Sequence, residues 1–270
     1  MTGAMGEGRF GFDAGKAPLE EALRWAAQSG FAYVEFSVDG PANAPAAWTG
    51  DRVNALRRLT VSSGVGVGLH TSSAVNVAET SPLMSAAADG YLRTVIELAA
   101  RLGCAWVVVH GGYHFTQDVE ARMSAAIERL AKACEWASAA GVELRLENHN
   151  REPDDAEIHY MPFNVEQTRK YLEKLRHPAM RWTFNAAHAN LVAEGIDGFL
   201  GELGIERLAQ VRLNDNDGLR ERHLLPGEGS IDFQALFHRL KAEGYRGPLV
   251  LGFGTWSDMG DWRERWERLV

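Results

Sequence analysis

The sequence has little of several features that mark common classes of protein. It contains two cysteines, Cys104 and Cys134, among 270 residues, too few for a disulfide framework or a zinc knuckle. No stretch reaches the roughly 18 uninterrupted apolar residues that a membrane-spanning helix needs. The first residues lack a basic segment followed by an apolar one, so no signal peptide is predicted. We therefore expect a cytoplasmic protein with no membrane partner.

A surplus of basic residues is also absent. The chain carries 28 Lys and Arg against 36 Asp and Glu, which gives a formal net charge of −8. Nucleic-acid binders usually present a basic face, so no nucleic-acid partner is expected and a small-molecule substrate is favoured. No GxGxxG or Walker motif follows the first apolar segment, so nothing predicts a nucleotide-phosphate site there.

Short apolar segments alternate with amphipathic segments about eight times along the chain. This alternation is typical of β/α units with buried parallel strands. Eight units in one chain of this length predict a closed (β/α)8 TIM barrel, read as a single domain over residues 1–270; an open doubly wound sheet is the alternative. The predicted strands are 9–12, 33–38, 65–70, 106–110, 143–148, 180–185, 209–214 and 248–253.

Polar side chains gather at the carboxyl ends of these predicted strands, which is where a barrel carries its chemistry. Neutral imidazole and carboxylate together are the usual ligands of zinc, manganese or iron. The pattern therefore predicts a polar pocket at one mouth of the barrel. Its predicted members include His70, His110, Glu147, His149, Asn185, His188, Arg212, Asn214, Glu221 and His223.

The order of these residues resembles the xylose isomerase-like TIM-barrel superfamily. The most specific stretch is 211–233, VRLNDNDGLRERHLLPGEGSIDF, and the likeness covers about residues 9 to 255. That superfamily includes sugar phosphate isomerases, 3-epimerases and class II apurinic-site endonucleases. The resemblance implies an enzyme, an isomerase or epimerase that removes a proton next to a carbonyl of a keto-sugar or polyol-type substrate.

One part of the superfamily pattern is altered. The resemblance implies that the isomerase branch holds a divalent ion with Glu, Asp, His and Glu, which fall here at Glu147, Asn185, Arg212 and Gly252. A guanidinium cannot lose its proton to become a metal ligand. We therefore expect a degenerate metal site in which Arg212 is the fixed cation. Arg212 would either pair with Glu147 or bind an anionic group of the substrate.

Two further ligand sets, those of the endonuclease branch, are better preserved. One comprises His70, His110 and Glu147, and the other comprises His188, Glu221 and His223. Either set has the donors to hold zinc or manganese with a position open to water or substrate. The alternative is a polar pocket that binds no metal or other cofactor.

The predicted catalytic residues are Glu147, Arg212 and His188. Glu147 would be the base, Arg212 or a metal would stabilise the enediolate, and a group such as His188, His223 or Glu228 would return the proton. The predicted substrate-binding residues are Glu35, Asn185, Asn214, Trp256 and Glu228, with Trp48 as a second aromatic candidate for stacking on a sugar.

Two other functions stay open at this point. One is a non-catalytic or repurposed barrel that binds a small anionic or polar ligand, and the less favoured one is a metal-dependent phosphodiesterase of the endonuclease type. The polar segment 150–162 is interpreted either as a lid or as a surface loop. A homo-oligomer is compatible with the sequence.

Overall fold

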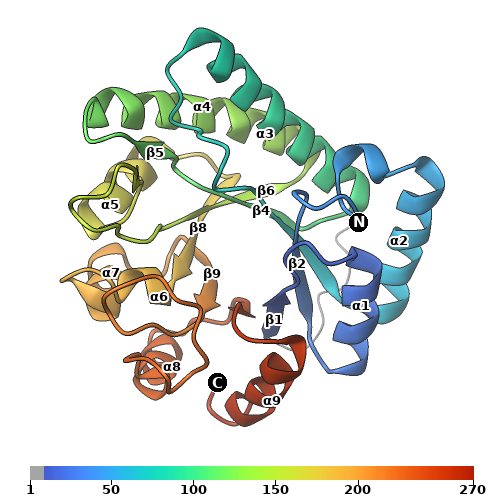
Figure 1. Ribbon diagram of the computed structural model, residues 1–270. Helices are drawn as coiled ribbons and strands as arrows, with labels where there is room; N and C mark the ends of the chain where they lie inside the picture. Colours follow the sequence, from blue (N-terminus) through green and yellow to red (C-terminus); the bar gives the residue numbers. More distant parts are fainter. Residues whose placement is uncertain (1–8) are drawn as a thin grey trace.

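The computed structural model describes residues 9–270 and forms a closed barrel of eight parallel strands inside a ring of helices (Figure 1). The strands follow the order β1-β10-β9-β8-β6-β4-β3-β2 around the barrel. The predicted (β/α)8 TIM barrel is therefore confirmed, and the alternative of an open sheet is wrong. The barrel strands are β1 Phe10–Asp13, β2 Tyr33–Ser37, β3 Gly66–His70, β4 Trp106–Val109, β6 Glu143–Glu147, β8 Met180–Asn185, β9 Leu208–Leu213 and β10 Leu249–Leu251.

The helices cover the outside of the barrel with their apolar faces. Helix α2 shows how the sequence sets their ends: the Thr49 side chain accepts a hydrogen bond from the Arg52 amide, and Gly64 ends the helix with a φ of 68°, which costs a residue without a Cβ little. No helix in residues 9–270 is long and apolar enough to cross a membrane. The helices are α1 Leu19–Gln28, η1 Pro45–Ala47, α2 Gly50–Ser63, α3 Pro82–Leu102, α4 Val119–Ala140, α5 Val165–Lys174, α6 Ala186–Ala189, α7 Gly195–Leu203, α8 Phe233–Ala242 and α9 Trp256–Trp266.

The Trp106 side chain fills the barrel interior beneath the site. A Cβ added to Gly68 would lie 2.2 Å from the indole nitrogen of Trp106, so only glycine leaves room for this ring. That nitrogen donates to Glu35 Oε1 at 2.6 Å, and the Arg145 guanidinium lies 4.0 Å from the ring centroid. Glu35 is fully buried and has the hydrogen-bond partners that a buried charge needs.

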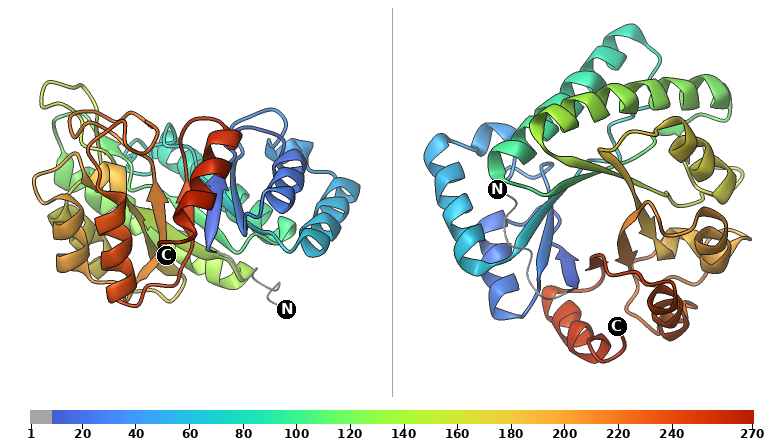
Figure 2. Two further views of the ribbon diagram at one scale, coloured as in Figure 1. Left: turned by 90° about the horizontal axis from the view of Figure 1, so that it is seen from below. Right: turned by 180° about the vertical axis from the view of Figure 1, so that it is seen from behind.

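Two short strands outside the barrel had no counterpart among the predicted strands. Strands β5, Tyr113–His114, and β7, His159–Tyr160, pair antiparallel and join the loops that follow β4 and β6. In the side view of Figure 2 the barrel strands point toward the end of the molecule that carries the long loops. The segment 150–162 is therefore tied by β7 to a neighbouring loop.

Trp48 does not stack on a pocket, as its predicted role would require. The side chain is only 3% exposed, its indole donates to the Asn43 carbonyl at 3.0 Å, and Arg52 stacks on its ring at 3.8 Å. Trp48 packs in the core because its whole surface is covered by these neighbours, and it has no face free for a sugar.

Candidate active site

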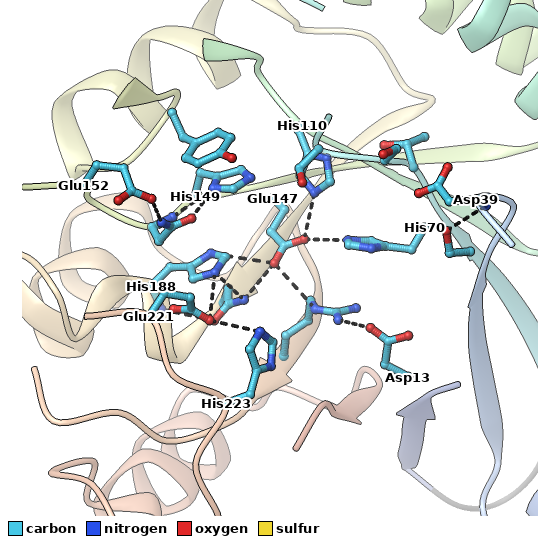
Figure 3. Close-up of a pocket in the computed structure, with 18 of the residues that line it drawn as sticks. Asp13, Asp39, His70, His110, Glu147, His149, Glu152, His188, Glu221 and His223 are labelled. Atoms are coloured by element: carbon cyan, nitrogen blue, oxygen red, sulfur yellow. Dashed lines mark hydrogen bonds and ion pairs between the residues drawn. The ribbon is translucent and has the colours of Figure 1, made fainter. Parts of the chain in front are cut away.

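A cavity of about 540 Å³ lies at the carboxyl ends of the barrel strands. It brings together residues that are far apart in the sequence but end successive strands, as the barrel geometry requires. Figure 3 shows the imidazoles and carboxylates pointing toward one another around Glu147. Of the predicted pocket residues, the cavity is lined by His70, His110, Glu147, His149, Asn185, His188, Arg212, Glu221 and His223.

Glu147 ends β6 and is the central group of the cavity, with only 2% of its surface exposed. Its Oε2 lies 2.9 Å from His70 Nε2 and 3.6 Å from His110 Nε2. Its Oε1 accepts a hydrogen bond from Asn185 Nδ2 at 2.8 Å and lies 3.5 Å from Arg212 Nε. The two oxygens therefore face two chemically different sets of neighbours.

Glu147 is held in its ionised form. Burial by itself would raise the pKa of this carboxyl, but the Arg212 charge and the two imidazoles outweigh burial and hold the pKa well below its usual range. A carboxylate at this position is consequently charged at neutral pH and available to accept a proton or to bind a cation.

Arg212 is enclosed by carboxylates. Its Nη2 lies 2.6 Å from Asp13 Oδ2, its Nη1 contacts Glu35, and its Nε faces Glu147. Although burial opposes the charged form, these carboxylates raise the pKa of Arg212 above its ordinary value. The expected pairing with Glu147 is present. An anionic substrate group would meet one guanidinium already surrounded by three carboxylates, so this arrangement does not favour the alternative of anion binding.

Asn185 connects Glu147 to the helix that follows β8. Its Nδ2 donates to Glu147, while its Oδ1 accepts from the His188 amide at 3.1 Å and so caps the short helix α6. His188 Nδ1 lies 2.7 Å from the Asn148 carbonyl oxygen, which can only accept, so Nδ1 carries a proton. His188 Nε2 is thereby directed toward Glu221, at 3.5 Å.

His188 and Glu221 form a pair that favours a protonated imidazole. Burial lowers the pKa of His188, but the Glu221 and Glu147 carboxylates outweigh burial, so the pKa is raised. The Glu221 pKa is lowered because His188 and His223 offset its burial. Asn214 is buried and donates to Glu221 at 3.2 Å, so it positions this carboxylate. His223 Nε2 lies 3.2 Å from Glu221, and its side chain is 59% exposed.

The residues on one side of Glu147 fit a divalent metal. The ligand atoms of His70, His110 and Glu147 all lie within 4.8 Å of one another. Tetrahedral ligands at about 2.05 Å from zinc are about 3.4 Å apart, and the separations of 2.9 and 3.6 Å bracket that value. Within residues 9–270 no second group of three such side chains has its ligand atoms this close together. The ligand atoms of His188, Glu221 and His223 therefore lie farther apart than those of the first set.

The four-ligand site implied for the isomerase branch does not fit this chain. Asn185 turns its amide nitrogen, a donor, toward Glu147. Arg212 brings a positive charge to the place of a ligand, and Gly252 has no side chain. A Cβ added to Gly252 would lie 3.7 Å from Arg212 Nη2. The guanidinium thus lies beside the position that would supply the fourth ligand.

Four of the five predicted substrate-binding residues, Glu35, Asn214, Trp256 and Glu228, are not among the residues that line this cavity. Trp256 borders an adjoining hollow that shares Asp13 and His223 with the cavity. Glu228 is exposed and accepts a hydrogen bond from its near neighbour Leu225 at 3.2 Å, so it is not placed to return a proton in the cavity. Trp256 begins α9 and packs against Phe12 and Trp25, each with ring centroids 5.4 Å away. Glu35 lies beneath the cavity and contacts it through Arg212.

Several lining residues were missed. Asp13 is the last residue of β1, just as His70 is the last residue of β3, so its position at a strand end could have predicted it as a lining residue. Asp39 and Glu152 come from loops and Tyr160 comes from the short strand β7, for none of which a periodic pattern gives a position. His149 was predicted in the pocket without a role of its own, and it lines the cavity with 6% of its surface exposed.

A closed parallel barrel with a polar, carboxylate-centred cavity at its carboxyl mouth defines a TIM barrel of the kind that carries active sites. The sequence assigns it further. A profile of the xylose isomerase-like TIM barrel family matches residues 23–269, and the chain belongs to that family.

Solved structures of similar fold cover nearly the whole chain. A D-tagatose 3-epimerase-like protein superposes with a TM-score of 0.82 at 22% identity, over 97% of this chain and 96% of that one. A D-psicose 3-epimerase from Clostridium cellulolyticum gives 0.76 at 16% identity, over 97% and 91%. The 3-keto-D-glucoside 4-epimerase YcjR from E. coli gives 0.75 at 17% identity, over 97% and 98%. At these identities the likeness concerns the fold.

The curated relatives carry no assigned function. The uncharacterized protein MJ1311 from Methanocaldococcus jannaschii is 29% identical over 166 residues, 59% of this chain and 54% of its own length. The uncharacterized protein y4fM from Sinorhizobium fredii is 27% identical over 174 residues, 58% of this chain and 50% of its own length. The chain spans about half the length of the curated relatives it matches.

Proposed function

We propose that this protein is an isomerase or epimerase that moves a proton at a carbon next to the carbonyl of a small hydroxylated substrate. One observation carries the proposal: an ionised carboxylate, Glu147, faces a polar cavity beside a histidine whose pKa is raised. Structures of 3- and 4-epimerases share the fold, which supports the same class of chemistry.

In this proposal Glu147 removes the proton. Hydrogen bonds from Asn185 and His70 fix the direction of its two oxygens, and a fixed direction favours proton transfer to a bound substrate. The Arg212 guanidinium, with its Nε 3.5 Å from Glu147, keeps this carboxylate in the ionised form that accepts the proton. His188 returns the proton, because the adjacent Glu221 favours its protonated form.

The metal-fitting side of the cavity has a place in the same proposal. His70, His110 and Glu147 are the residues that would hold a divalent ion such as zinc or manganese. Such an ion, when bound, supplies Lewis-acid polarisation of a carbonyl oxygen. His70 and His110 also orient Glu147 directly, through the contacts at 2.9 and 3.6 Å.

The charge of the cavity indicates which substrates it accepts. Five carboxylates line it, Asp13, Asp39, Glu147, Glu152 and Glu221, against two permanent cations, Lys16 and Arg212. A negatively charged substrate would be repelled by this surplus. The cavity therefore favours an uncharged keto-sugar or polyol over a sugar phosphate, and the same surplus argues against a phosphodiester substrate.

Proton exchange in D₂O tests the proposal. The protein is incubated with a panel of unphosphorylated ketoses, including D-tagatose, D-psicose and D-fructose, and deuterium at the carbons next to the carbonyl is followed by NMR. Exchange is expected with at least one ketose, and Glu147→Gln should reduce it about 10³-fold. Glu157→Gln, at an exposed glutamate in the loop after the same strand, is the matched control.

Absence of exchange with every ketose would reject this function. Titration calorimetry with the same panel then identifies the alternative, a barrel that binds a polar ligand without turning it over. That alternative predicts saturable binding with no change in the chemical state of the ligand.

A further inference from the structure

His149 is a buried imidazole in the cavity wall to which the proposed reaction assigns no step. It follows β6, two residues after Glu147, and is 6% exposed. Its ring lies nearly parallel to those of Tyr160 and His188, with centroid distances of 4.1 and 5.3 Å and interplanar angles of 12°. The edge of His110 approaches it at 5.0 Å. These contacts hold the ring in one orientation (Figure 3).

Two short hydrogen bonds determine which nitrogen of His149 carries the proton. Asn150 Nδ2 lies 2.6 Å from Glu152 Oε1, and a carboxylate oxygen accepts, so the amide nitrogen of Asn150 must face Glu152. Asn150 Oδ1 then faces His149 Nδ1, at 2.5 Å. Two acceptors would repel each other at that distance, so Nδ1–H is the donor.

A longer contact competes with this assignment and does not change it. The main-chain N–H of Asn150 lies 3.1 Å from the same Nδ1, and it would prefer an unprotonated nitrogen there. The 2.5 Å contact with Oδ1 is shorter and is fixed from the other side by Glu152. Turning the amide round would set Asn150 Oδ1 against Glu152 Oε1, and moving the proton to Nε2 would set Nδ1 against Asn150 Oδ1, so either change opposes two acceptors at one short contact.

The lone pair of His149 is thereby left on Nε2. Among residues 9–270, Nε2 makes no hydrogen bond with the protein, although the ring lines the cavity. Nε2 is not among the buried atoms without a partner, so it opens to the cavity, where a bound molecule with a hydrogen-bond donor can pair with it.

The chemistry of the donor follows from the rest of the wall. The cavity carries five carboxylates, so acceptors already predominate, and a ligand rich in O–H groups satisfies several of them at once. His149 does not belong to the compact group of metal-fitting residues, so a metal is not the expected partner of Nε2. A hydroxyl group is small and neutral and donates readily.

We propose that His149 forms a hydroxyl-binding subsite, in which Nε2 accepts a hydrogen bond from one hydroxyl of an uncharged polyhydroxy substrate. Asn150 and Glu152 are positioning residues, because they fix the tautomer that leaves Nε2 as the acceptor. The subsite rests on the proposed function, which it deepens, and shares its ligand class, an uncharged sugar or polyol.

The tautomer is tested first, without any substrate. Long-range ¹H–¹⁵N NMR of the full chain should show His149 with a protonated Nδ1 and an unprotonated Nε2. Asn150→Leu should convert this single tautomer into a mixture, while Asn54→Leu, at an exposed asparagine of helix α2, should leave it unchanged. A His149 with its proton on Nε2 in the unaltered protein would overturn the proposal.

Ligand binding is tested second. The same ketose panel is titrated by calorimetry into the wild type and into His149→Phe, which keeps a ring to stack on Tyr160 but has no Nε2. Loss of one neutral hydrogen bond should raise Kd about three- to tenfold. The variant should also stop discriminating between the bound ketose and its deoxy analogue that lacks the contacted hydroxyl. His159→Phe is the matched control, because that ring stacks on His114 and does not line the cavity.

The outcomes separate this subsite from the proposed reaction. Exchange by the wild type together with unchanged affinity and discrimination in His149→Phe rejects the subsite alone. Binding that depends on His149, without exchange of any proton, rejects the reaction and supports the subsite. A wild type that binds none of the ketoses rejects both.

Discussion

The two oxygens of Glu147 face two different half-sites. On the Oε2 side lie His70 and His110, two imidazoles that are close enough together to hold a metal with Glu147. On the Oε1 side lie Asn185 and Arg212, an amide and a permanent cation. One carboxylate thus connects a half-site that retains metal ligands with a half-site that has none.

The difference between the half-sites indicates that an arginine can supply the positive charge that a metal ion supplies in the family pattern. The family pattern implies carboxylates and a metal near Arg212, and the structure has carboxylates and a guanidinium there. Asp13, Glu35 and Glu147 share one fixed positive charge without an ion, because that cation is covalently part of the chain. We expect four substitutions to separate the two half-sites.

The largest effect is expected on the guanidinium side. Arg212→Met leaves two buried carboxylates, Glu35 and Glu147, and the partly exposed Asp13 without their cation, which should lower the free energy of unfolding by about 3–5 kcal/mol, as measured by urea denaturation. Arg220→Met, at an exposed arginine, is the control and should change it by less than about 0.5 kcal/mol.

The difference in free energy of unfolding between the wild type and Arg212→Met should be smaller in acid. Arg212 and the imidazoles lower the folded-state pKa of Glu147, and Arg212 and His70 lower that of Asp13. Their stabilisation is present above the unfolded pKa, near 4, and is lost as the pH falls through the folded values. The gap between wild type and Arg212→Met should therefore narrow below about pH 4. If the difference in free energy of unfolding instead increases in acid, the three carboxylates are not stabilised by Arg212.

The second effect concerns metal affinity on the imidazole side. His70→Ala removes one of three ligands and should weaken binding of zinc or manganese at least about 100-fold, as measured by equilibrium dialysis. Asn185→Ala, on the other side of Glu147, removes only a hydrogen bond that orients this ligand and should weaken affinity about tenfold, clearly less than His70→Ala. His238→Ala, at an exposed histidine on α8, is the control. Equal losses in His70→Ala and Asn185→Ala would show that the ion binds between the two half-sites.

The third effect concerns the proton donor. The pKa of His188 is raised in the folded protein, so its protonated form persists above the ordinary histidine range and is lost as the pH rises through the folded value. Glu221→Gln removes the main attraction, and the alkaline limb of the exchange rate should move to lower pH. At pH 8 the rate should fall about tenfold, less than the 10²–10⁴-fold that loss of a general acid costs. If the alkaline limb does not move in Glu221→Gln, a group other than His188 returns the proton.

The smallest effect is expected beside Arg212 at Gly252. A Cβ there meets Arg212 Nη2 at 3.7 Å, an ordinary contact, so Gly252→Ala should change the free energy of unfolding by less than about 0.5 kcal/mol. Gly68→Ala is the contrasting variant, because its Cβ would lie 2.2 Å from the Trp106 indole and overpacking costs about 1–3 kcal/mol. Thermal unfolding of both variants makes the comparison.

The fold and the centre of the cavity were predictable from the sequence for a common reason. Apolar segments of strand length mark where each strand ends, and in a barrel those ends converge, so the order of residues alone places His70, His110 and Glu147 together. Only some of the contacts of Arg212 were predicted from the sequence: its pairing with Glu147 was expected, whereas its contact with Asp13 was overlooked.

Residues in long loops were not predictable by the same reasoning. Glu228 lies 15 residues after the end of β9 at Leu213, and no periodicity sets the path between them. Trp256 falls in a predicted loop, but α9 begins there and directs its ring toward Phe12 and Trp25. The pairing of β5 with β7 depends on two loops meeting in space, which neither loop encodes alone.

The double role of Asn185, which caps α6 and holds Glu147, bears on how such a site can evolve. Asn185→Asp would preserve the cap but oppose two carboxylates, and Arg212→His would remove the cation that balances them. Gly252→Glu would add another negative charge to the same place. Each step alone is harmful until a divalent ion is captured, so lineages should fall into discrete groups with few intermediates between them.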